Sequence, residues 1–390
     1  MAMDPLWSAP GGGPVAISAD GGFVLSDGDS FGLYDATGNT TWRGYGGSSA
    51  RSGSLITSPL DLTADGMYAI LATNGGLLYV DRSRRIFWQD SAYHPILDLS
   101  LSPDENFVAS VADGRVSVYT RGGDLVWRNS TYSDVQTVAI SSEGLLTVAG
   151  ATDTIHAYNR TGFELWNYTA PGVHRVLLSP ENSDIIAASE YTLLSLHPSG
   201  NLLWKVYTGD EIRAVAISRD GSTIAAGNQG GSLLLLDRDG TQLFSRMLGN
   251  WVNTVSLSGD GSLVAAGDID RKVHLLDRNG RQLFNYTTGG IVQGIAVSTD
   301  GSALAAGSDR VYYFDLRQPV PATTPVPPPV ATATLPVTTP APATSPPVTT
   351  GPTTPAGTVP AVTTTRSAAG PWAIPALGIL FLWFALRRGR

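Results

Sequence analysis

Short apolar segments separated by tight polar turns run through the first 318 residues and predict β-strands almost throughout. Residues 214–247 show the pattern clearly: AVAIS, a turn at Asp220-Gly221, the runs TIAAG and SLLLLD, and a second turn that leads into TQLFSRM. Segments of five or six residues that are bounded by Asp-Gly turns are typical of antiparallel strands. We therefore expect a four-stranded meander in this part of the chain.

This meander is repeated along the chain. In each unit a short apolar strand ends in Ser or Thr and meets a turn that carries an acidic residue. These aligned acidic residues are Asp20, Asp65, Asp104, Glu143, Glu181, Asp220, Asp260 and Asp300, at spacings of 45, 39, 39, 38, 39, 40 and 40 residues. Four strands and their turns need about 40 residues, which is the period of a propeller blade. The sequence therefore predicts an all-β fold, an eight-bladed β-propeller.

A large aromatic residue follows the third strand of each complete unit by a constant distance. It stands seven residues after the last polar position of that strand, as in Asp237 to Phe244. A flat side chain on every fourth strand suits the gap between blades, where it buries much apolar area. The expected blade-packing aromatics are Trp7, Trp42, Trp88, Trp127, Trp166, Trp204, Phe244 and Phe284.

The eighth unit lacks its own fourth strand, because the chain enters a Pro/Thr-rich segment after VYYFDLRQPV. At the other end of the chain, residues 5–12 (PLWSAPGG) match LWNYTAPG, which follows Glu164, and they directly precede the first strand of unit one. We therefore expect the N-terminal strand to complete the last blade and to close the ring. Closure removes the open sheet edges that promote aggregation.

Over residues 5–318 the chain resembles the WD40-like and quinoprotein-like repeat families. GLYDATGNTTW, from Gly32, is similar to the repeat of pyrroloquinoline-quinone (PQQ) propellers, A-x-D-x-x-T-G-x-x-x-W, with one residue fewer before the Trp. The GH and WD dipeptides of true WD40 repeats are absent. The resemblance implies the propeller fold. It leaves the activity open, because both families use this fold for unrelated tasks.

Charge and composition exclude several classes of function. Residues 1–318 hold 21 of the 25 basic residues and all 33 acidic ones, a net charge of −12, against −8 for the whole chain of 390 residues. An acidic body repels phosphate backbones, so we expect no nucleic-acid partner. The absence of cysteine excludes thiol nucleophiles, thiolate zinc sites and the vicinal cysteine pair that the resemblance to quinoprotein dehydrogenases would imply.

The C-terminal part predicts a stalk and a membrane anchor. Residues 319–366 are uncharged up to Arg366 and consist almost entirely of Pro, Thr, Ala and Val, a composition that favours a disordered linker, bare or O-glycosylated. Residues 367–386 are 20 uncharged residues, enough for a transmembrane helix across a hydrocarbon core of about 30 Å. Residues 387–390 form a basic tail, which we expect in the cytoplasm.

This topology places the propeller outside the cell, on a single-pass cell-membrane protein. The end of the chain resembles the C-terminal anchors of archaeal surface proteins, particularly those of methanogens, although Ala369-Gly370-Pro371-Trp372 stands where some of them carry a Pro-Gly-Phe processing signal. Residues 1–10 contain neither the basic nor the apolar part of an export signal. An outside location therefore predicts a signal upstream of residue 1. The alternative is a cytoplasmic propeller with a tail anchor.

A ligand face is expected where the second and third strands of each blade are joined. The connections between those strands share one face of a propeller with the connections between blades, and this face usually carries the ligand site. The candidate residues are Asp29, Asn74, Asp113, Asp153, Glu190, Asn228, Asp268 and Asp309. A ring of carboxylates suits a cation such as Ca²⁺ or a polyhydroxyl ligand. The same residue types are also common turn formers, which is the simpler interpretation.

The remaining polar residues indicate no catalytic cluster. The five histidines fall in different units without HxH or HExxH spacing, which favours scattered positions over metal ligands. Candidate N-glycosylation sites are Asn39, Asn129, Asn159, Asn167 and Asn285.

These patterns favour a surface-displayed, non-enzymatic module that binds a protein or glycan, with no required cofactor and with an oligomeric state that the sequence leaves open. The alternatives are a PQQ-like propeller enzyme, such as a quinone-dependent dehydrogenase or a polysaccharide lyase, and a structural component of the cell envelope.

Overall fold

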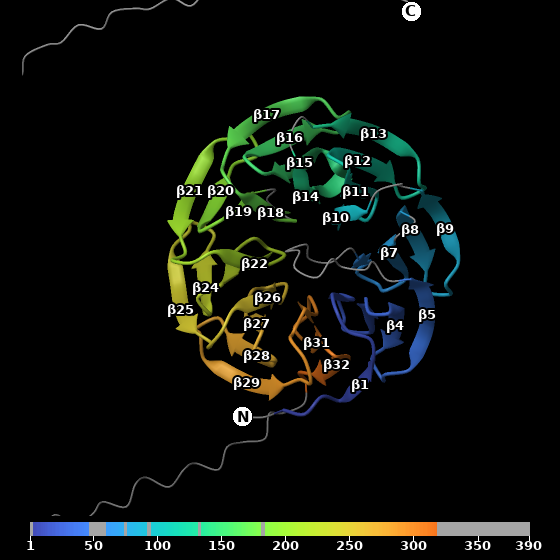
Figure 1. Ribbon diagram of the computed structural model, residues 1–390, viewed down its shortest axis with the longest axis vertical. Helices are drawn as coiled ribbons and strands as arrows, with labels where there is room; N and C mark the ends of the chain where they lie inside the picture. The colour runs from blue at the N-terminus through green and yellow to red at the C-terminus, as the bar shows by residue number, and fades with distance from the viewer. Residues whose placement is uncertain are drawn as a thin grey trace, which may run out of the picture. The chain divides into compact units, whose positions relative to one another are not determined.

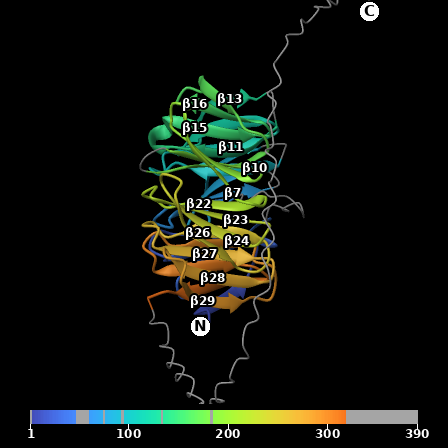
Figure 2. The same cartoon turned by 90° about the vertical axis from the view of Figure 1, so that its left-hand side faces the viewer.

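The computed structural model describes residues 3–46, 60–73, 76–91, 95–131, 134–180 and 184–317, all within one compact unit. These residues form eight four-stranded antiparallel sheets arranged as a ring around a central axis (Figure 1). Figure 2 shows the same ring edge-on, with the strands of successive blades one above another. We number the blades 1–8 in the order of their innermost strands.

Each blade contributes one strand to each of four concentric positions. The inner strands are β2 (Val15–Ile17), β6 (Leu60–Leu62), β10 (Ile96–Leu101), β14 (Val135–Ile140), β18 (Val173–Leu178), β22 (Ile212–Ile217), β26 (Val252–Leu257) and β30 (Gly294–Val297). The second strands are β3 (Phe23–Ser26), β7 (Tyr68–Thr73), β11 (Phe107–Ala112), β15 (Leu146–Ala151), β19 (Ile185–Ser189), β23 (Thr223–Asn228), β27 (Leu263–Asp268) and β31 (Ala303–Gly307).

The two outer positions complete the blades. The third strands are β4 (Ser30–Asp35), β8 (Gly76–Asp81), β12 (Arg115–Thr120), β16 (Thr154–Asn159), β20 (Thr192–Leu196), β24 (Ser232–Asp237), β28 (Lys272–Asp277) and β32 (Arg310–Asp315). The outer strands are β5 (Thr40–Gly46), β9 (Ile86–Asp90), β13 (Leu125–Ser130), β17 (Glu164–Thr169), β21 (Leu202–Tyr207), β25 (Gln242–Met247), β29 (Gln282–Thr287) and β1 (Trp7–Pro10). In the described part of the chain, η1 (Ser142–Gly144) is a short 3-10 turn between β14 and β15.

The hydrophobic pattern of each strand follows its place in the blade. All six residues of β23 are buried and so are the four central residues of β24, because both faces of these strands pack against neighbouring blades. The outer strand β25 alternates between exposed and partly buried residues after its first two positions. One face of an outer strand meets solvent, so only every second side chain needs to be apolar. The core therefore lies between blades, as a series of clusters.

The recurrent Ser/Thr and Asp at the first turn have a structural role. The Ser18 hydroxyl accepts a hydrogen bond from the Phe23 N–H at 2.9 Å and donates one to the Asp20 carboxylate at 2.7 Å. Gly21 follows with a φ of +70°, a conformation that favours glycine. The Ser18 hydroxyl and the Gly22 N–H hold the pKa of Asp20 below its ordinary value. This serine, acid and glycine turn joins the first and second strands in most blades.

Aromatic side chains of the outer strands hold neighbouring blades together. The Trp204 indole N–H donates a hydrogen bond to the Arg238 carbonyl oxygen of the next blade at 2.7 Å. Gly240, in the same turn as Arg238, packs against the Trp204 indole, and a Cβ at this position would come within 2.7 Å of the indole. Equivalent indole contacts occur at Trp7, Trp88 and Trp166, each with a carbonyl oxygen of the following blade.

The N-terminal strand closes the ring. β1 pairs with β32 in antiparallel register, with Trp7 opposite Tyr313 and Pro10 opposite Arg310. The ring of Trp7 stacks on that of Tyr313, with centroids 5.2 Å apart and planes 3° from parallel. Arg310 reaches across the ladder to the Ser8 hydroxyl and carbonyl oxygens, both at 3.2 Å. Blade 8 therefore combines the two ends of the propeller, and the predicted all-β, eight-bladed fold with N-terminal closure is confirmed.

The predicted stalk (319–366), transmembrane helix (367–386) and basic tail (387–390) lie outside the described residues. Within the described ranges, no helix has the length and apolar character needed to cross a lipid bilayer.

Candidate functional site

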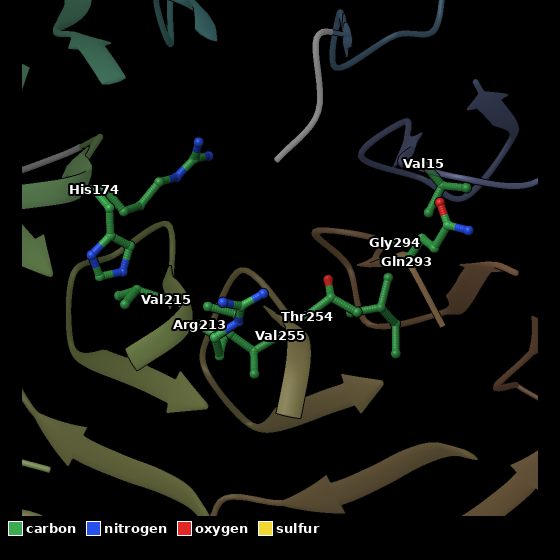
Figure 3. A pocket seen from close by; sticks show the side chains of 11 residues that line it. Val15, His174, Arg213, Val215, Thr254, Val255, Gln293 and Gly294 are labelled. Atoms are coloured by element: carbon green, nitrogen blue, oxygen red, sulfur yellow. The ribbon is translucent and has the colours of Figure 1, made fainter. Parts of the chain in front are cut away.

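The central channel holds a pocket of about 180 Å³ that is lined by residues of blades 5, 6, 7, 8 and 1. Its polar lining comes from His174 and Arg175 on β18, Arg213 on β22, Thr254 on β26, and Gln293 directly before β30. Figure 3 shows His174 and Arg213 on one side of the pocket, with Gln293 and Val15 on the other. Because inner strands of five blades contribute, the pocket belongs to the channel and not to a gap between two blades.

The pocket lies toward one end of the channel. His174, Arg213 and Val15 each stand at the first or second position of an inner strand, where the chain enters from the previous blade. In an antiparallel meander that end of the inner strand lies on the same face as the turn between the second and third strands. The pocket and the eight predicted turn residues therefore share a face of the propeller.

Arg213 forms a longer ion pair than Arg175, the other arginine of the pocket. The closest carboxylate oxygen, Oε1 of Glu211, is 3.8 Å from its Nη1, which is beyond hydrogen-bond distance. Its Nε is buried and finds no hydrogen-bond partner among the described residues. Burial lowers the pKa of Arg213, although an arginine remains charged at neutral pH. The guanidinium lies over the ring of Trp251, 5.4 Å from its centroid.

Arg175 is held by a carboxylate from two blades away. Its Nη1 lies 3.2 Å from Oδ1 of Asp98, whose side chain is almost completely buried. The Asp98 carboxylate also accepts hydrogen bonds from the Thr137 hydroxyl at 2.8 Å and the Val138 N–H at 3.0 Å. Burial raises the pKa of Asp98, and the charge of Arg175 opposes this effect. The pair therefore fixes Arg175 and joins the inner strands of blades 3, 4 and 5.

A second inner-strand carboxylate repeats part of this arrangement. Asp61 on β6 accepts a hydrogen bond from the Leu101 N–H of the next blade at 3.3 Å. Burial raises the pKa of Asp61 to about 6. Asp61 and Asp98 stand on blades 2 and 3, whereas Arg175 and Arg213 stand on blades 5 and 6, so the channel lining carries acidic and basic groups on different blades.

His174 lines the same pocket. Its Nδ1 lies 3.3 Å from the Gly172 carbonyl oxygen, which can only accept, so Nδ1 carries the proton of the neutral ring. Burial lowers the pKa of His174, which favours that neutral form. Its Nε2 is buried and has no hydrogen-bond partner within the described ranges.

The eight predicted turn residues do not form a uniform ring. Four of them are exposed at the tips of short turns, namely Asp29, Asp113, Asp153 and Glu190. Asp309 is exposed but accepts hydrogen bonds from the Gly289 N–H at 3.0 Å and the Tyr312 hydroxyl at 2.9 Å. Asn74 lies outside the described residues. Among the residues that the structure describes, no three His, Cys, Asp or Glu side chains gather as a metal-binding group.

The prediction that Asn228 and Asp268 belong to an exposed ligand face is wrong, because both side chains are buried. The Asn228 side chain accepts a hydrogen bond from the Ser232 N–H and donates one to the Thr208 carbonyl oxygen. Asp268 accepts from the Lys272 N–H at 2.8 Å and lies 3.0 Å from Nε2 of His274. The second and third strands of these two blades are separated by three residues, against two in blades 3, 4, 5 and 8, so the polar residue begins the turn and bonds inward instead of standing at its tip.

The candidate glycosylation sites differ in how accessible their side chains are. Asn167 and Asn285 are exposed on outer strands, and Asn39 is exposed in a turn where it bonds to Asp35. Asn129 is partly buried and donates to the Gly162 carbonyl oxygen of the next blade. Asn159 is partly buried, and its side chain accepts the Thr161 N–H at 3.0 Å within a turn.

The remaining described histidines bond locally: His156 with Glu164, His197 with Ser199, and His274 with Asp268. His94 lies outside the described residues. Sequence reasoning treated all five histidines as scattered and missed the pocket that His174 lines. The position seven residues before the aligned acid is polar in other units as well, as at Gln136 and Asn253, so the sequence contains no signal that singles out the pocket residues.

Comparisons with known proteins support the fold and identify a family. A family model described as outer membrane protein assembly factor BamB, of the PQQ-like repeat type, matches residues 112–229 and 189–318. A model of the WD domain, G-beta repeat, matches residues 89–120. No curated protein matches the sequence.

Solved propellers of low sequence identity share the architecture. Sqt1 of Chaetomium thermophilum, solved with the N-terminus of ribosomal protein L10, is 16% identical with a TM-score of 0.63, over 78% of this chain and 97% of that one. The computationally designed protein Ika8 is 18% identical with a TM-score of 0.66, over 80% and 100%. U3-55K is 14% identical with a TM-score of 0.56, over 66% and 94%.

At such identities these structures establish the fold alone. The family matches extend over residues 112–318, more than half of the 390 residues, and they coincide with the repeated blades. The chain therefore belongs to the PQQ-like repeat β-propellers, in the family described as outer membrane protein assembly factor BamB.

Proposed function

We propose that this propeller is a non-enzymatic binding module that holds a protein or glycan ligand at the channel face of blades 5–8. The observation that carries the proposal is the pocket around Arg213, whose lining side chains differ from blade to blade. Function usually resides where a repeated pattern is broken. Around it, Trp251 and Ile291 are 40% and 48% exposed on connections between blades, and exposed aromatic and arginine side chains are enriched at binding sites.

The polar groups of the pocket suit binding more than covalent chemistry. Arg213 offers N–H donors and a fixed positive charge, and Thr254 and Gln293 offer further hydrogen-bonding groups. Val15, Val255 and Ile295 supply apolar surface beside them.

The proposal includes display at the cell surface. The Pro/Thr-rich residues 319–366, the apolar residues 367–386 and the arginines of residues 387–390 support a stalk, a membrane span and a cytoplasmic end. Protease treatment of intact cells tests this part, because a propeller outside the cell is released without lysis. Resistance until the cells are lysed would contradict surface display.

Binding is tested with the full chain in detergent against a glycan array and a panel of purified surface proteins. We expect Arg213→Ala to abolish binding of any ligand held at the pocket. Arg219→Ala is the matched control, because Arg219 is exposed in the same blade on the turn between the inner and second strands, and therefore on the opposite face. Equal loss in both variants, or no ligand in either panel, would count against a binding function at this face.

The alternative function, a quinone-dependent enzyme, is tested by measuring whether PQQ binds the folded protein. PQQ with Ca²⁺ should raise the melting temperature of the protein only if the folded state binds them. A rise that is accompanied by dye-linked alcohol oxidation would replace the proposal of a binding module with that of a quinone-dependent dehydrogenase.

A further inference from the structure

We propose that the outer wall of blade 2, where the turn between β8 and β9 carries Arg84 and Arg85, binds an acidic segment of a partner protein that also contains apolar side chains. This surface is separate from the channel pocket and does not depend on the function proposed for that pocket. The proposal follows from a break in the repeated turn, from the charge of that turn, and from the apolar side chains beside it.

Arg84 stands where the equivalent turns of other blades have glycine. In each of these turns the residue donates its backbone N–H to the carbonyl oxygen three residues earlier. The equivalent residues of blades 1 and 3–7 are Gly38, Gly123, Gly162, Gly200, Gly240 and Gly280, with φ between +77° and +91°. Arg84 has a φ of +66°, a conformation that is unfavourable for a residue with a Cβ. Such outliers are concentrated at functional sites.

Blade 1 contributes a second irregularity at the same place. β5 has one extra residue opposite β4, and this bulged residue, Tyr45, has a φ of +54°. Its hydroxyl donates to the Arg84 carbonyl oxygen at 3.0 Å, and the Arg84 guanidinium lies over its ring, 5.0 Å from the centroid. A bulge redirects a side chain, and here it brings Tyr45 to the turn of the next blade. Figure 1 shows β5 and β9 as neighbours on the outer edge of the ring.

The turn carries a net positive charge. Residues 81–85 contain three arginines and one aspartate, which gives +2. Arg84 and Arg85 are exposed, and neither forms an ion pair with a described residue, whereas Arg281, at the place of Arg85 in blade 7, is paired with Asp277 at 2.9 Å. The net charge of −12 on residues 1–318 is spread over the ring, and at physiological ionic strength it is screened beyond about 8 Å.

Apolar side chains adjoin the two arginines on the outer wall. Ile86 and Phe87, the first residues of β9, are 41% and 49% exposed, and the Arg85 guanidinium lies over the Phe87 ring, 5.3 Å from its centroid. Leu125 and Val126, at the same positions of β13, are also exposed. Exposed apolar residues continue onto later blades, but among blades 1–7 only blade 2 has an arginine in the glycine position. The proposed surface is therefore centred on blade 2.

This composition selects the kind of partner. Arginine and aromatic side chains are enriched where proteins bind one another. An exposed ion pair contributes little by itself, so a partner needs several carboxylates together with apolar groups that cover Ile86 and Phe87. The hydroxyl groups of a polyanionic glycan would lose hydrogen bonds to water against these side chains, which is costly. An acidic protein segment with apolar residues supplies both kinds of group.

Fluorescence anisotropy with the full chain in detergent tests the site. The probe is a labelled peptide of four Glu-Glu-Leu repeats, and two matched peptides have Gln in place of Glu or Ser in place of Leu. We expect a Kd below about 100 µM for the probe and at least about tenfold weaker binding of each matched peptide, a difference of about 1.4 kcal/mol. Equal affinity of either matched peptide, or no binding of the probe, would overturn the inference.

Variants that restore the pattern of other blades locate the binding. Arg84→Gly and Arg85→Asn reproduce Gly38 and Asn39 of blade 1, so the melting temperature should not fall. Each change should weaken the probe about threefold, and both together about tenfold. Arg281→Asn is the matched control and should leave the affinity unchanged, because Arg281 is already paired with a carboxylate. Unchanged affinity in the folded double variant, or an equal loss in Arg281→Asn, would refute the site.

Two further measurements distinguish other occupants. Sedimentation velocity of the chain alone detects self-association, and a dimer that the double variant abolishes would assign the surface to a second copy instead of a partner protein. Hyaluronan that binds more tightly than the probe, and more weakly to the double variant, would replace the protein partner with a polyanionic glycan. Arg213→Ala should not affect the probe, so failure here is distinguishable from failure of the binding function at the channel.

Discussion

Replacing Trp7 by Ala removes the side chain that fastens the N-terminal strand to the ring. The ring of Trp7 stacks on Tyr313 at 5.2 Å and lies 5.7 Å from Tyr34, and its indole N–H donates to the Ala36 carbonyl oxygen at 3.0 Å. A buried Trp→Ala change costs about 3–5 kcal/mol. Since Trp7 is only partly buried, we expect about 3 kcal/mol from packing and about 1 kcal/mol from the lost hydrogen bond.

This loss is large enough to measure. A ring of about 310 residues has an unfolding entropy near 0.65 kcal/mol/K, so a loss of about 4 kcal/mol lowers the melting temperature by about 6 °C. Trp7→Phe keeps an aromatic ring on Tyr313 but loses the indole bond, and should lower it by about 1.5 °C. Differential scanning calorimetry of the full chain gives these shifts.

Trp204→Ala is the matched control, because Trp204 makes the same kind of indole bond from blade 5, whose four strands are continuous in sequence. Hydrogen exchange distinguishes the two changes. Trp7→Ala should expose the Leu6 amide, which bonds to the Tyr313 carbonyl oxygen at 2.8 Å, whereas Trp204→Ala should leave that amide protected. A melting temperature of Trp7→Ala within about 1 °C of the wild type would refute the reasoning that closure depends on this contact.

Three further changes test the inner strands and turns. Burial raises the pKa of Asp61 to about 6, so the folded state binds this proton more tightly than the unfolded chain does. As the pH rises from about 4 to about 7, the wild type should therefore lose up to about 3 kcal/mol of unfolding free energy relative to Asp61→Asn, and less where channel water reaches the carboxylate. A difference between their melting temperatures that does not change with pH would contradict this. Gly123→Ala should lower the free energy of unfolding by more than about 2 kcal/mol, because the new Cβ would come within 2.5 Å of the Trp88 indole. Gly114 also has a positive φ but open space around it, so Gly114→Ala should cost only about 1 kcal/mol. Urea unfolding measures both values. Asp98→Ala should cost about 3–5 kcal/mol because it leaves Arg175 and two other donors without their buried acceptor, and an unchanged urea midpoint would refute that role.

The fold was predictable because each blade repeats the same local chemistry. The turn at Ser18, Asp20 and Gly21 recurs with a period of about 40 residues, and its bonds depend only on residues close in sequence. Closure was predictable as well, because residues 5–12 have the sequence of an outer strand at a place where no blade precedes them.

The pocket was not predictable by the same reasoning. It is assembled from single residues on five blades, so no local segment contains its pattern, and Arg175 is fixed by a carboxylate 77 residues away. The burial of Asn228 and Asp268 was missed because residues aligned by repeat were assumed to have equal environments. One extra residue in the turn is enough to place such a side chain inward.

The N-terminal strand also determines how the propeller would carry a mechanical load. β32 is the last described strand and is flanked by β31 on one side and β1 on the other. A pull on the chain beyond residue 317 therefore draws β32 along its own axis between two antiparallel ladders, so that many hydrogen bonds resist together. Without β1 the same pull would act on an edge strand held by one ladder of hydrogen bonds instead of two. A propeller tethered through its C-terminal end would in this way be protected from unravelling by the first ten residues of its own chain.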